Sequence, residues 1–292
     1  MSKIIIACIV INFYALGFVT PFHFHTKNIT QSGLRGTAKL SLTFDDGPAN
    51  ASTTSVLDSL KLYSEYGFNI QATFFVVGKR AKTKKGLKAL QRMQDEGHII
   101  ASHSYSHQKL SDPKYANEKN LLKETYNVHQ IIAPYLPPID DLERKWYFRA
   151  PYGAWHSQRS GILNLHDQLK NYVGPIGWDV GSFNRYSDGG SLIRAADWQC
   201  WSTGVSVQYC ALGYIREANE KGGGVVLLHD IHDKTAEMFK YLLVTWTGVN
   251  LFDDEKYSMH QQQQNYAMDF VSLDEIEAYD QFDDRLTFEN EE

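Results

Sequence analysis

The segment Leu42-Thr-Phe-Asp45-Asp46-Gly-Pro48 decides the fold, because an apolar run there ends abruptly in two adjacent carboxylates and a turn. Adjacent residues inside a strand point to opposite faces, so Asp45 and Asp46 can face one centre only where the strand ends. Gly47 and Pro48 provide that end. Two neighbouring carboxylates repel each other, so the pair predicts a cation or an arginine close by.

Outward from this segment, apolar strand patterns alternate with helical periodicity, which indicates an α/β fold around a mainly parallel sheet or barrel. The strand candidates are 39–44, 72–77, 99–102, 146–149, 172–180, 224–228 and 267–271. The helix candidates are 52–63, 84–95, 117–132, 158–169, 207–219 and 234–245. In such folds, sites assemble at the carboxyl ends of the strands.

A pair of histidines follows the third strand candidate, in the segment His103-Ser-Tyr-Ser-His107. Two imidazoles four residues apart share a face on a helical turn, which suits a divalent metal ion. Alone, the pair is equally compatible with two structural histidines. Together with Asp46 it makes a three-ligand site that leaves positions open for water and substrate.

Two further segments leave strand candidates in the same way. In Arg149-Ala-Pro151-Tyr152-Gly153, the proline and the glycine fix an irregular backbone that can aim an amide N–H into a pocket. Arg149 is a candidate ion-pair partner for Asp45. The apolar run that begins at Gly224 ends in His229 and Asp230, at the same edge of the predicted sheet.

In this order, the four segments resemble the polysaccharide deacetylase family, the fourth family of carbohydrate esterases. The resemblance extends to Ala72–Gly78, to Glu96-Gly-His98 and to Phe270–Asp274, and covers about residues 38–277. It implies a deformed parallel (β/α) barrel with about seven strands. We therefore expect a catalytic domain over residues 38–280, followed by an acidic tail at 281–292.

The resemblance also assigns roles to individual residues. Asp46, His103 and His107 become ligands of a divalent metal, for which Zn²⁺ is the expectation and Co²⁺ the alternative. Asp45 becomes the general base, with Arg149 as its partner. His229 becomes the general acid, and the backbone N–H of Tyr152 holds the oxyanion. Pro151, Trp178 and Leu228 are expected to bind the substrate around its acetyl group.

The chain departs from the family pattern after Trp178. The family commonly places an aspartate that supports the acid histidine where this chain has Gly181, and Asp-Trp where it has Asn184 and Arg185. This departure leaves open which group supports His229. Asp179, Asp197 and Asp230 are the candidates.

Residues 1–20 resemble a secretory signal, with a lysine followed by an apolar run that is too short to span a bilayer. Its removal would leave Cys200 and Cys210, and an even count in an exported protein predicts a disulfide. The formal net charge is -5 without a basic run, which argues against a nucleic-acid partner. The sequence implies no partner protein, and we expect a secreted, periplasmic or cell-envelope location.

The leading hypothesis is hydrolysis of N-acetyl groups on N-acetylglucosamine residues, with peptidoglycan ahead of chitin as the polymer. The alternatives are an esterase acting on O-acetylated xylan and a catalytically inactive carbohydrate-binding relative. Trp155, Trp178, Trp198 and Trp201 are candidates for stacking on sugar rings, although most tryptophans of this kind belong to the core.

Overall fold

The computed structural model describes residues 24–276, with gaps at 30–31, 142–143 and 261–265. The expected signal at 1–20 and the expected tail at 281–292 lie outside these residues. No helix in the described part of the chain is both long and apolar enough to cross a bilayer.

The central sheet is built around β2 (Lys39–Asp45), which is buried from its second residue onward. Along one edge β2 pairs in parallel with β9 (Gly223–His229) over its whole length. It also pairs with β10 (Asp269–Phe270) near its start and with β3 (Thr73–Val76) near its end. β3 in turn pairs with β4 (Ile99–Ser102). Burial on both faces explains why these strands read as near-continuous apolar runs.

A second parallel sheet contains β5 (Trp146–Tyr147), β6 (Tyr172–Ile176) and β1 (Phe24–Ile29). Two parallel bridges connect it to the central sheet, one from Ser102 to Phe148 and one from Val180 to Val226. The pairings therefore run from β2 through β3, β4, β5 and β6 to β9 and back to β2. This ring of short, unevenly paired strands has the mainly parallel pairing that the sequence predicts for the α/β fold.

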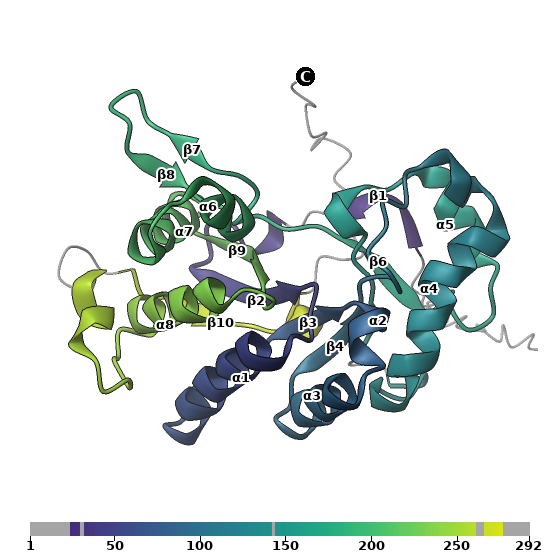
Figure 1. Ribbon diagram of the computed structural model, residues 1–292, viewed down its shortest axis with the longest axis horizontal. Coiled ribbons are helices and arrows are strands. Elements are labelled where there is room, and N and C mark those ends of the chain that lie inside the picture. The colour runs from purple at the N-terminus through teal and green to yellow at the C-terminus, as the bar shows by residue number, and fades with distance from the viewer. Residues whose placement is uncertain (1–23, 30–31, 142–143, 261–265, 277–292) are drawn as a thin grey trace, which may run out of the picture.

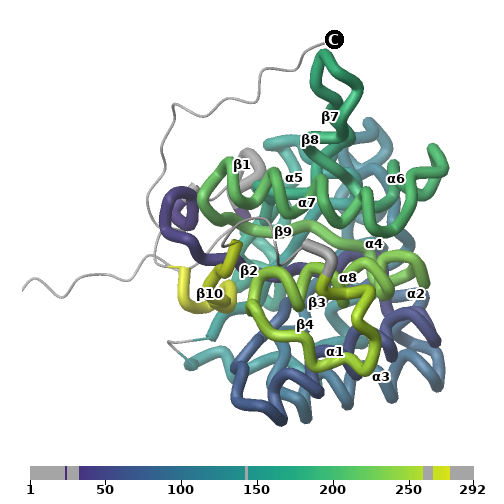
Figure 2. The backbone as a smooth tube through the Cα atoms, turned by 90° about the vertical axis from the view of Figure 1, so that its left-hand side faces the viewer, coloured from purple at the N-terminus to yellow at the C-terminus, as the bar shows by residue number. Residues whose placement is uncertain are grey.

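Helices surround the ring (Figure 1). They are α1 (Asn50–Glu65), α2 (Gly78–Ala81), α3 (Lys84–Asp95), α4 (Glu118–Ile132), α5 (Ser157–Asn164), α6 (Asp197–Thr203), α7 (Val207–Lys221) and α8 (Asp233–Thr247). α8 packs against α1 and α7, and the apolar side chains between these helices and β2 form the main core. A hairpin of β7 (Arg185–Tyr186) and β8 (Leu192–Arg194) projects from the body beside α6 and α7 (Figure 2).

The six expected helices are present, and that at Lys84–Asp95 has the expected bounds. The helix expected over 158–169 ends at Asn164. β1, α2, the β7–β8 hairpin and α6 were not predicted. Phe24 and Leu34 are buried in the core, so the folded unit begins before residue 38.

Candidate active site

The carboxyl ends of β2, β4 and β9 meet at a cavity of about 350 Å³. Asp45 ends β2, and Asp46 follows it with a positive φ of 75°, which turns the chain out of the strand. The two carboxylates consequently face the same cavity, as their position before Gly47 and Pro48 predicts. The predicted site residues that line it are Asp45, Asp46, His103, His107, Tyr152, Trp178 and His229.

Asp46, His103 and His107 form a group that could hold a metal ion. Asp46 Oδ1 lies 2.9 Å from His107 Nε2 and 3.4 Å from His103 Nε2. Ligand atoms of a tetrahedral metal with bonds of 2.0–2.2 Å are separated by about 3.4 Å, so the spacing fits one ion. Asp46 Oδ1 is buried and has no hydrogen bond of good geometry to the described residues. This is the state expected of an oxygen that binds a cation.

A hydrogen bond from its Nδ1 orients His103 so that Nε2 can bind a cation. Its Nδ1 lies 2.9 Å from the carbonyl oxygen of Arg149, and a carbonyl can only accept, so Nδ1 carries the proton. The lone pair of Nε2 is therefore free to face Asp46 and the cavity. Burial raises the pKa of Asp46, but His103 and His107 outweigh this effect and bring that pKa well below its usual range. Asp46 is consequently ionised, as a metal ligand must be.

Arg149 forms the expected ion pair with Asp45. Its side chain is fully buried, and Nη1 donates to Asp45 Oδ1 over 2.7 Å and to Thr43 Oγ1 over 2.8 Å. The backbone carbonyls of Ile176 and Gly177 accept from Nε and Nη2, so four of the five N–H donors of this buried charge have partners. The second oxygen of Asp45 lies 3.5 Å from His103 Nε2, next to the metal group.

His229 ends β9, and its Nδ1 lies 2.7 Å from Asp197 Oδ1. Burial lowers the pKa of His229, but the charge and hydrogen bond of Asp197, together with the charges of Asp46 and Asp45, outweigh this effect and raise it to about 9. Of the three candidate aspartates, Asp197 is therefore the one that supports His229. Asp179 instead pairs with Arg35, and Asp230 instead accepts from Thr53.

Two of the residues expected at the pocket, Leu228 and Pro151, do not line it. Leu228 does not line the cavity: it is fully buried in the core, and Leu227 lines the cavity instead. The reason is strand alternation, because Leu227 shares a face with His229, two residues on. Pro151 is buried in a 3₁₀ turn and is not among the lining residues, whereas its neighbour Tyr152 is.

The tryptophans divide into two groups. Trp178 and Trp198 line the cavity, and Trp198 is 47% exposed. Trp155 packs on Phe24, and Trp201 donates from its indole N–H to Thr235. Ser182 and His232 also line the cavity and were not predicted, although His232 lies three residues after His229 at the start of α8.

The geometry agrees with comparisons to known proteins. The family profile described as polysaccharide deacetylase matches residues 35–168. A peptidoglycan-N-acetylglucosamine deacetylase of Listeria monocytogenes is 31% identical over 202 residues, which are 68% of this chain and 34% of that protein. The chain belongs to the polysaccharide deacetylase family.

One further curated relative and two solved structures extend the comparison. A chitin deacetylase of Saccharomyces cerevisiae is 32% identical over 204 residues, 69% of this chain and 53% of that protein. A cobalt-containing family 4 acetyl xylan esterase from Clostridium thermocellum superposes with a TM-score of 0.55 at 23% identity, covering 82% of this chain and 89% of that one. The peptidoglycan deacetylase PdaC of Bacillus subtilis superposes with a TM-score of 0.50 at 24% identity, and the match covers 75% of this chain and 86% of that one. The two structures establish the fold, and the chain spans about a third of the Listeria relative's length.

Proposed function

We propose that this protein hydrolyses the N-acetyl groups of N-acetylglucosamine residues in a polysaccharide and releases acetate. The observation that carries the proposal is the meeting of three groups in one cavity: the Asp46, His103 and His107 ligand set, the carboxylate of Asp45 and the imidazole of His229. The relatives named for peptidoglycan and for chitin support this substrate class. Of these two polymers, we expect peptidoglycan rather than chitin to be the substrate.

In this proposal Asp46, His103 and His107 hold a divalent metal, with Zn²⁺ as the expectation and Co²⁺ as the alternative. Such an ion, when bound, makes water nucleophilic near neutral pH and polarises the acetyl carbonyl. Asp45 removes the proton from the attacking water, and Arg149 holds its carboxylate in place. The backbone N–H of Tyr152, which has a φ of 61° at the cavity edge, donates to the carbonyl oxygen as negative charge develops.

His229 protonates the leaving nitrogen. An amine leaves only when it is protonated, so amide hydrolysis needs an acid that keeps its proton at the working pH. Although burial lowers the pKa of His229, the charge and the hydrogen bond of Asp197 stabilise the protonated imidazole and raise that pKa, which meets that need. An ester releases an alcohol and depends less on an acid, so this feature favours the N-deacetylase over the O-acetyl xylan esterase. A binding protein without catalysis would need neither the acid nor the base.

The disulfide and the substrate together support an exported location at the cell envelope. Cys200 and Cys210 are joined, with Cα atoms 6.1 Å apart, as predicted. Disulfides persist in oxidising compartments, where cell-wall polymers also lie.

The proposal is tested by measuring acetate release from peptidoglycan, chitin oligomers and acetylated xylan, with Zn²⁺ and with chelator. We expect metal-dependent release from the first two substrates at a rate well above that from xylan. Faster release from xylan would favour the esterase, and no release from any of the three would refute the proposed activity.

A further inference from the structure

The segment from residue 79 to residue 88 is strongly basic. It contains six cations and no acidic residue, although the chain as a whole has a formal net charge of -5. The expectation that the chain lacks a basic run is therefore wrong for this segment. All six residues are exposed, and together they are called the basic patch: Lys79, Arg80, Lys82, Lys84, Lys85 and Lys88.

Hydrogen bonds attach the basic patch to the loop that carries two of the metal-site residues. The backbone N–H of Lys79 donates to the carbonyl oxygen of Tyr105 over 2.8 Å. Lys82 Nζ donates to the Tyr105 hydroxyl over 2.6 Å. Tyr105 lies midway between His103 and His107 in the sequence. The first part of the patch is therefore fixed against the metal-site loop.

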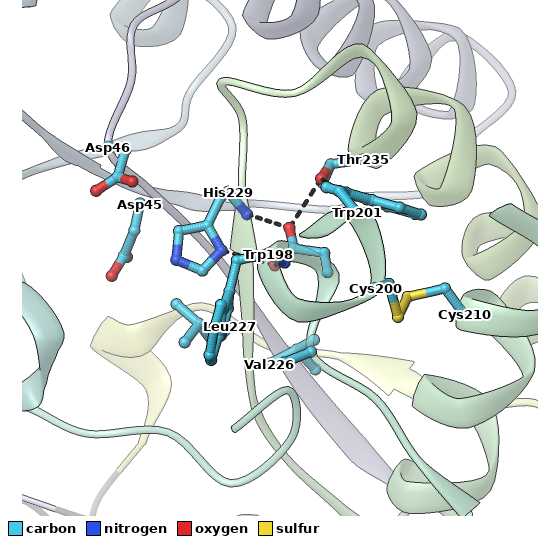
Figure 3. Close-up of polar contacts among 12 residues, drawn as sticks. Asp45, Asp46, Trp198, Cys200, Trp201, Cys210, Val226, Leu227, His229 and Thr235 are labelled. Carbon is cyan, nitrogen blue, oxygen red and sulfur yellow. Dashed lines mark hydrogen bonds and ion pairs between the residues drawn. A yellow bond between two sulfur atoms is a disulfide. The ribbon is translucent and has the colours of Figure 1, made fainter. Parts of the chain in front are cut away.

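The basic patch lies on the side of the cavity that carries the metal group. The backbone N–H of Val77, two residues before the patch, donates over 2.8 Å to the carbonyl oxygen of Gly47, the residue that follows Asp46. Figure 3 shows Asp46 on one side of the His229 ring and the disulfide on the other. The patch is thus on the opposite side of the acid imidazole from α6.

The positive charge of the patch reaches the cavity. His232 lines the cavity and lies directly before α8. Burial is the main cause of the lowered pKa of His232, and the charge of Arg80 contributes to the lowering. Arg80 is therefore within electrostatic range of a substrate in the cavity.

A second hollow, of about 400 Å³, extends the surface along the patch. Lys85 and Lys88 line it from α3, and Pro48 lines it from the turn that ends β2. α1 and α3 follow the carboxyl ends of β2 and β3, so their first turns lie at the same face of the ring as the cavity. The hollow thus offers two cations to groups of a polymer that extend beyond the cavity.

The charges of the patch do not serve the stability of the fold. In the described part of the chain, no salt bridge joins any of the six to an acidic residue, and the neighbouring acids Asp58 and Glu96 pair with Arg92 instead. α3 begins with two lysines and has no acidic residue in its first turn, where the helix dipole disfavours cations. Unpaired cations in unfavourable positions indicate a binding role.

We propose that the basic patch binds carboxylate groups of the polymer substrate and so selects an anionic polysaccharide over a neutral one. The inference rests on the proposed function, because it concerns the polymer that enters the same cavity. Peptidoglycan carries free carboxylates on its peptide stems, whereas chitin has none. Single exposed lysines bind anions weakly, but six charges of one sign produce a field that attracts and orients an anionic polymer.

The test uses three substrates that differ in charge. They are a soluble peptidoglycan fragment with free stem carboxylates, the same fragment with these carboxylates amidated, and chitin oligomers. KM and kcat are measured for acetate release by the Zn²⁺-loaded protein. Kd is measured by stopped-flow tryptophan fluorescence before substrate is consumed. Both are repeated at about 0.01 M and about 0.15 M salt, because the Debye length falls from about 30 Å to about 8 Å over this range.

Three double variants are compared with wild type. Lys85→Glu/Lys88→Glu reverses the charge beside the second hollow, and Lys85→Arg/Lys88→Arg retains it. Lys119→Glu/Lys123→Glu makes the same change of net charge on α4, where both lysines are exposed and do not line the cavity. The first variant should fold at least as stably as wild type, since acidic residues suit the start of a helix. Thermal denaturation checks this.

We expect wild type at low salt to bind the carboxylated fragment about tenfold more tightly than the amidated one, and the difference should shrink at the higher salt. Lys85→Glu/Lys88→Glu should raise KM for the carboxylated fragment by about tenfold, because it removes binding that does not change during the reaction. Its kcat, and its KM for the two neutral substrates, should stay within about twofold of wild type. The arginine variant and the α4 control should match wild type.

Equal Kd values for the two fragments in wild type would overturn the inference, as would an equal rise of KM for both fragments in Lys85→Glu/Lys88→Glu. An equal loss in the α4 control would assign the effect to net charge rather than to the patch. Tighter binding of a duplex oligonucleotide than of the carboxylated fragment would assign the patch to a nucleic acid. If wild type released no acetate from any substrate, the proposed function would fail, but the Kd values would still decide whether the patch binds the carboxylated polymer.

Discussion

Asp45 and His229 are directly opposite each other in the parallel register of β2 and β9. Each is the last residue of its strand, so two chain segments that are far apart in sequence deliver the proposed base and the proposed acid to the same edge of the ring. Arg149 holds the carboxylate and Asp197 holds the imidazole. A carboxylate and an imidazole are thereby held in place at one cavity, an arrangement that suits acid–base catalysis.

Removal of a metal ligand should abolish metal binding. Asp46→Ala, His103→Ala and His107→Ala should each weaken the binding of one Zn²⁺ per chain by more than about 100-fold, because two ligands cannot hold an ion that also binds water. Metal analysis after dialysis measures this. His166→Ala is the control, since the His166 ring packs against Tyr126 at a tilt of 47° and does not line the cavity. Full occupancy in all three ligand variants would show that the metal site lies elsewhere.

Asp45→Asn should retain the metal and lose turnover, with kcat falling by about 10²–10⁴ because a base is removed without a ligand. The variant also leaves the charge of Arg149 buried and unpaired, which should cost about 3–5 kcal/mol of stability. Kinetics should therefore be measured well below the melting temperature of the variant. Near-normal kcat in folded, metal-loaded protein would mean that another group is the base.

Leu227 and Leu228 provide a matched pair of substitutions on opposite faces of one strand. Leu228→Ala should lower the free energy of unfolding by about 2–5 kcal/mol, because it opens a cavity in the core, and should leave KM unchanged. Leu227→Ala should enlarge the substrate pocket and raise activity on N-propionyl substrates relative to N-acetyl substrates. The reverse result, with acyl preference changed by Leu228→Ala alone, would contradict the assignment of the two faces.

Gly181→Asp should destabilise the protein rather than improve the acid. Gly181 has a φ of 96°, and its Cβ would clash with the Leu227 carbonyl at 2.5 Å. The expected loss is about 2 kcal/mol or more in chemical denaturation. Gly190→Asp is the control, because Gly190 also has a positive φ, of 75°, but has open space around its Cβ position. Equal stability of the two variants would show that the space at Gly181 is not filled as described.

The sequence predicts most of the fold because its signals are local. Apolar strands that end in polar residues locate Asp46, His103, Arg149 and His229, and strand alternation could also have distinguished Leu227 from Leu228. The partner of His229 could not be chosen in this way. Three aspartates were chemically equivalent candidates, and the decision depends on how α6 packs against β9, which is a tertiary contact between residues 32 positions apart.

The short elements are the other part that the sequence did not predict. β7 has two residues and β8 has three, and their pairing depends on the connection between them rather than on an apolar face. β1, at the N-terminal end of the described chain, pairs with β6 (Tyr172–Ile176), a long-range contact without a local signal. The disulfide was predicted from the even number of cysteines that removal of the expected signal would leave.

The most direct test of the central claim is a measurement of acetate release from purified peptidoglycan by the Zn²⁺-loaded wild type and by Asp45→Asn, before and after chelation. The account predicts steady release by the wild type, loss of release with chelator, recovery when Zn²⁺ or Co²⁺ is restored, and very little release by Asp45→Asn at any metal concentration. Release by the wild type that persists in chelator, with the ion shown to be absent, would contradict the account.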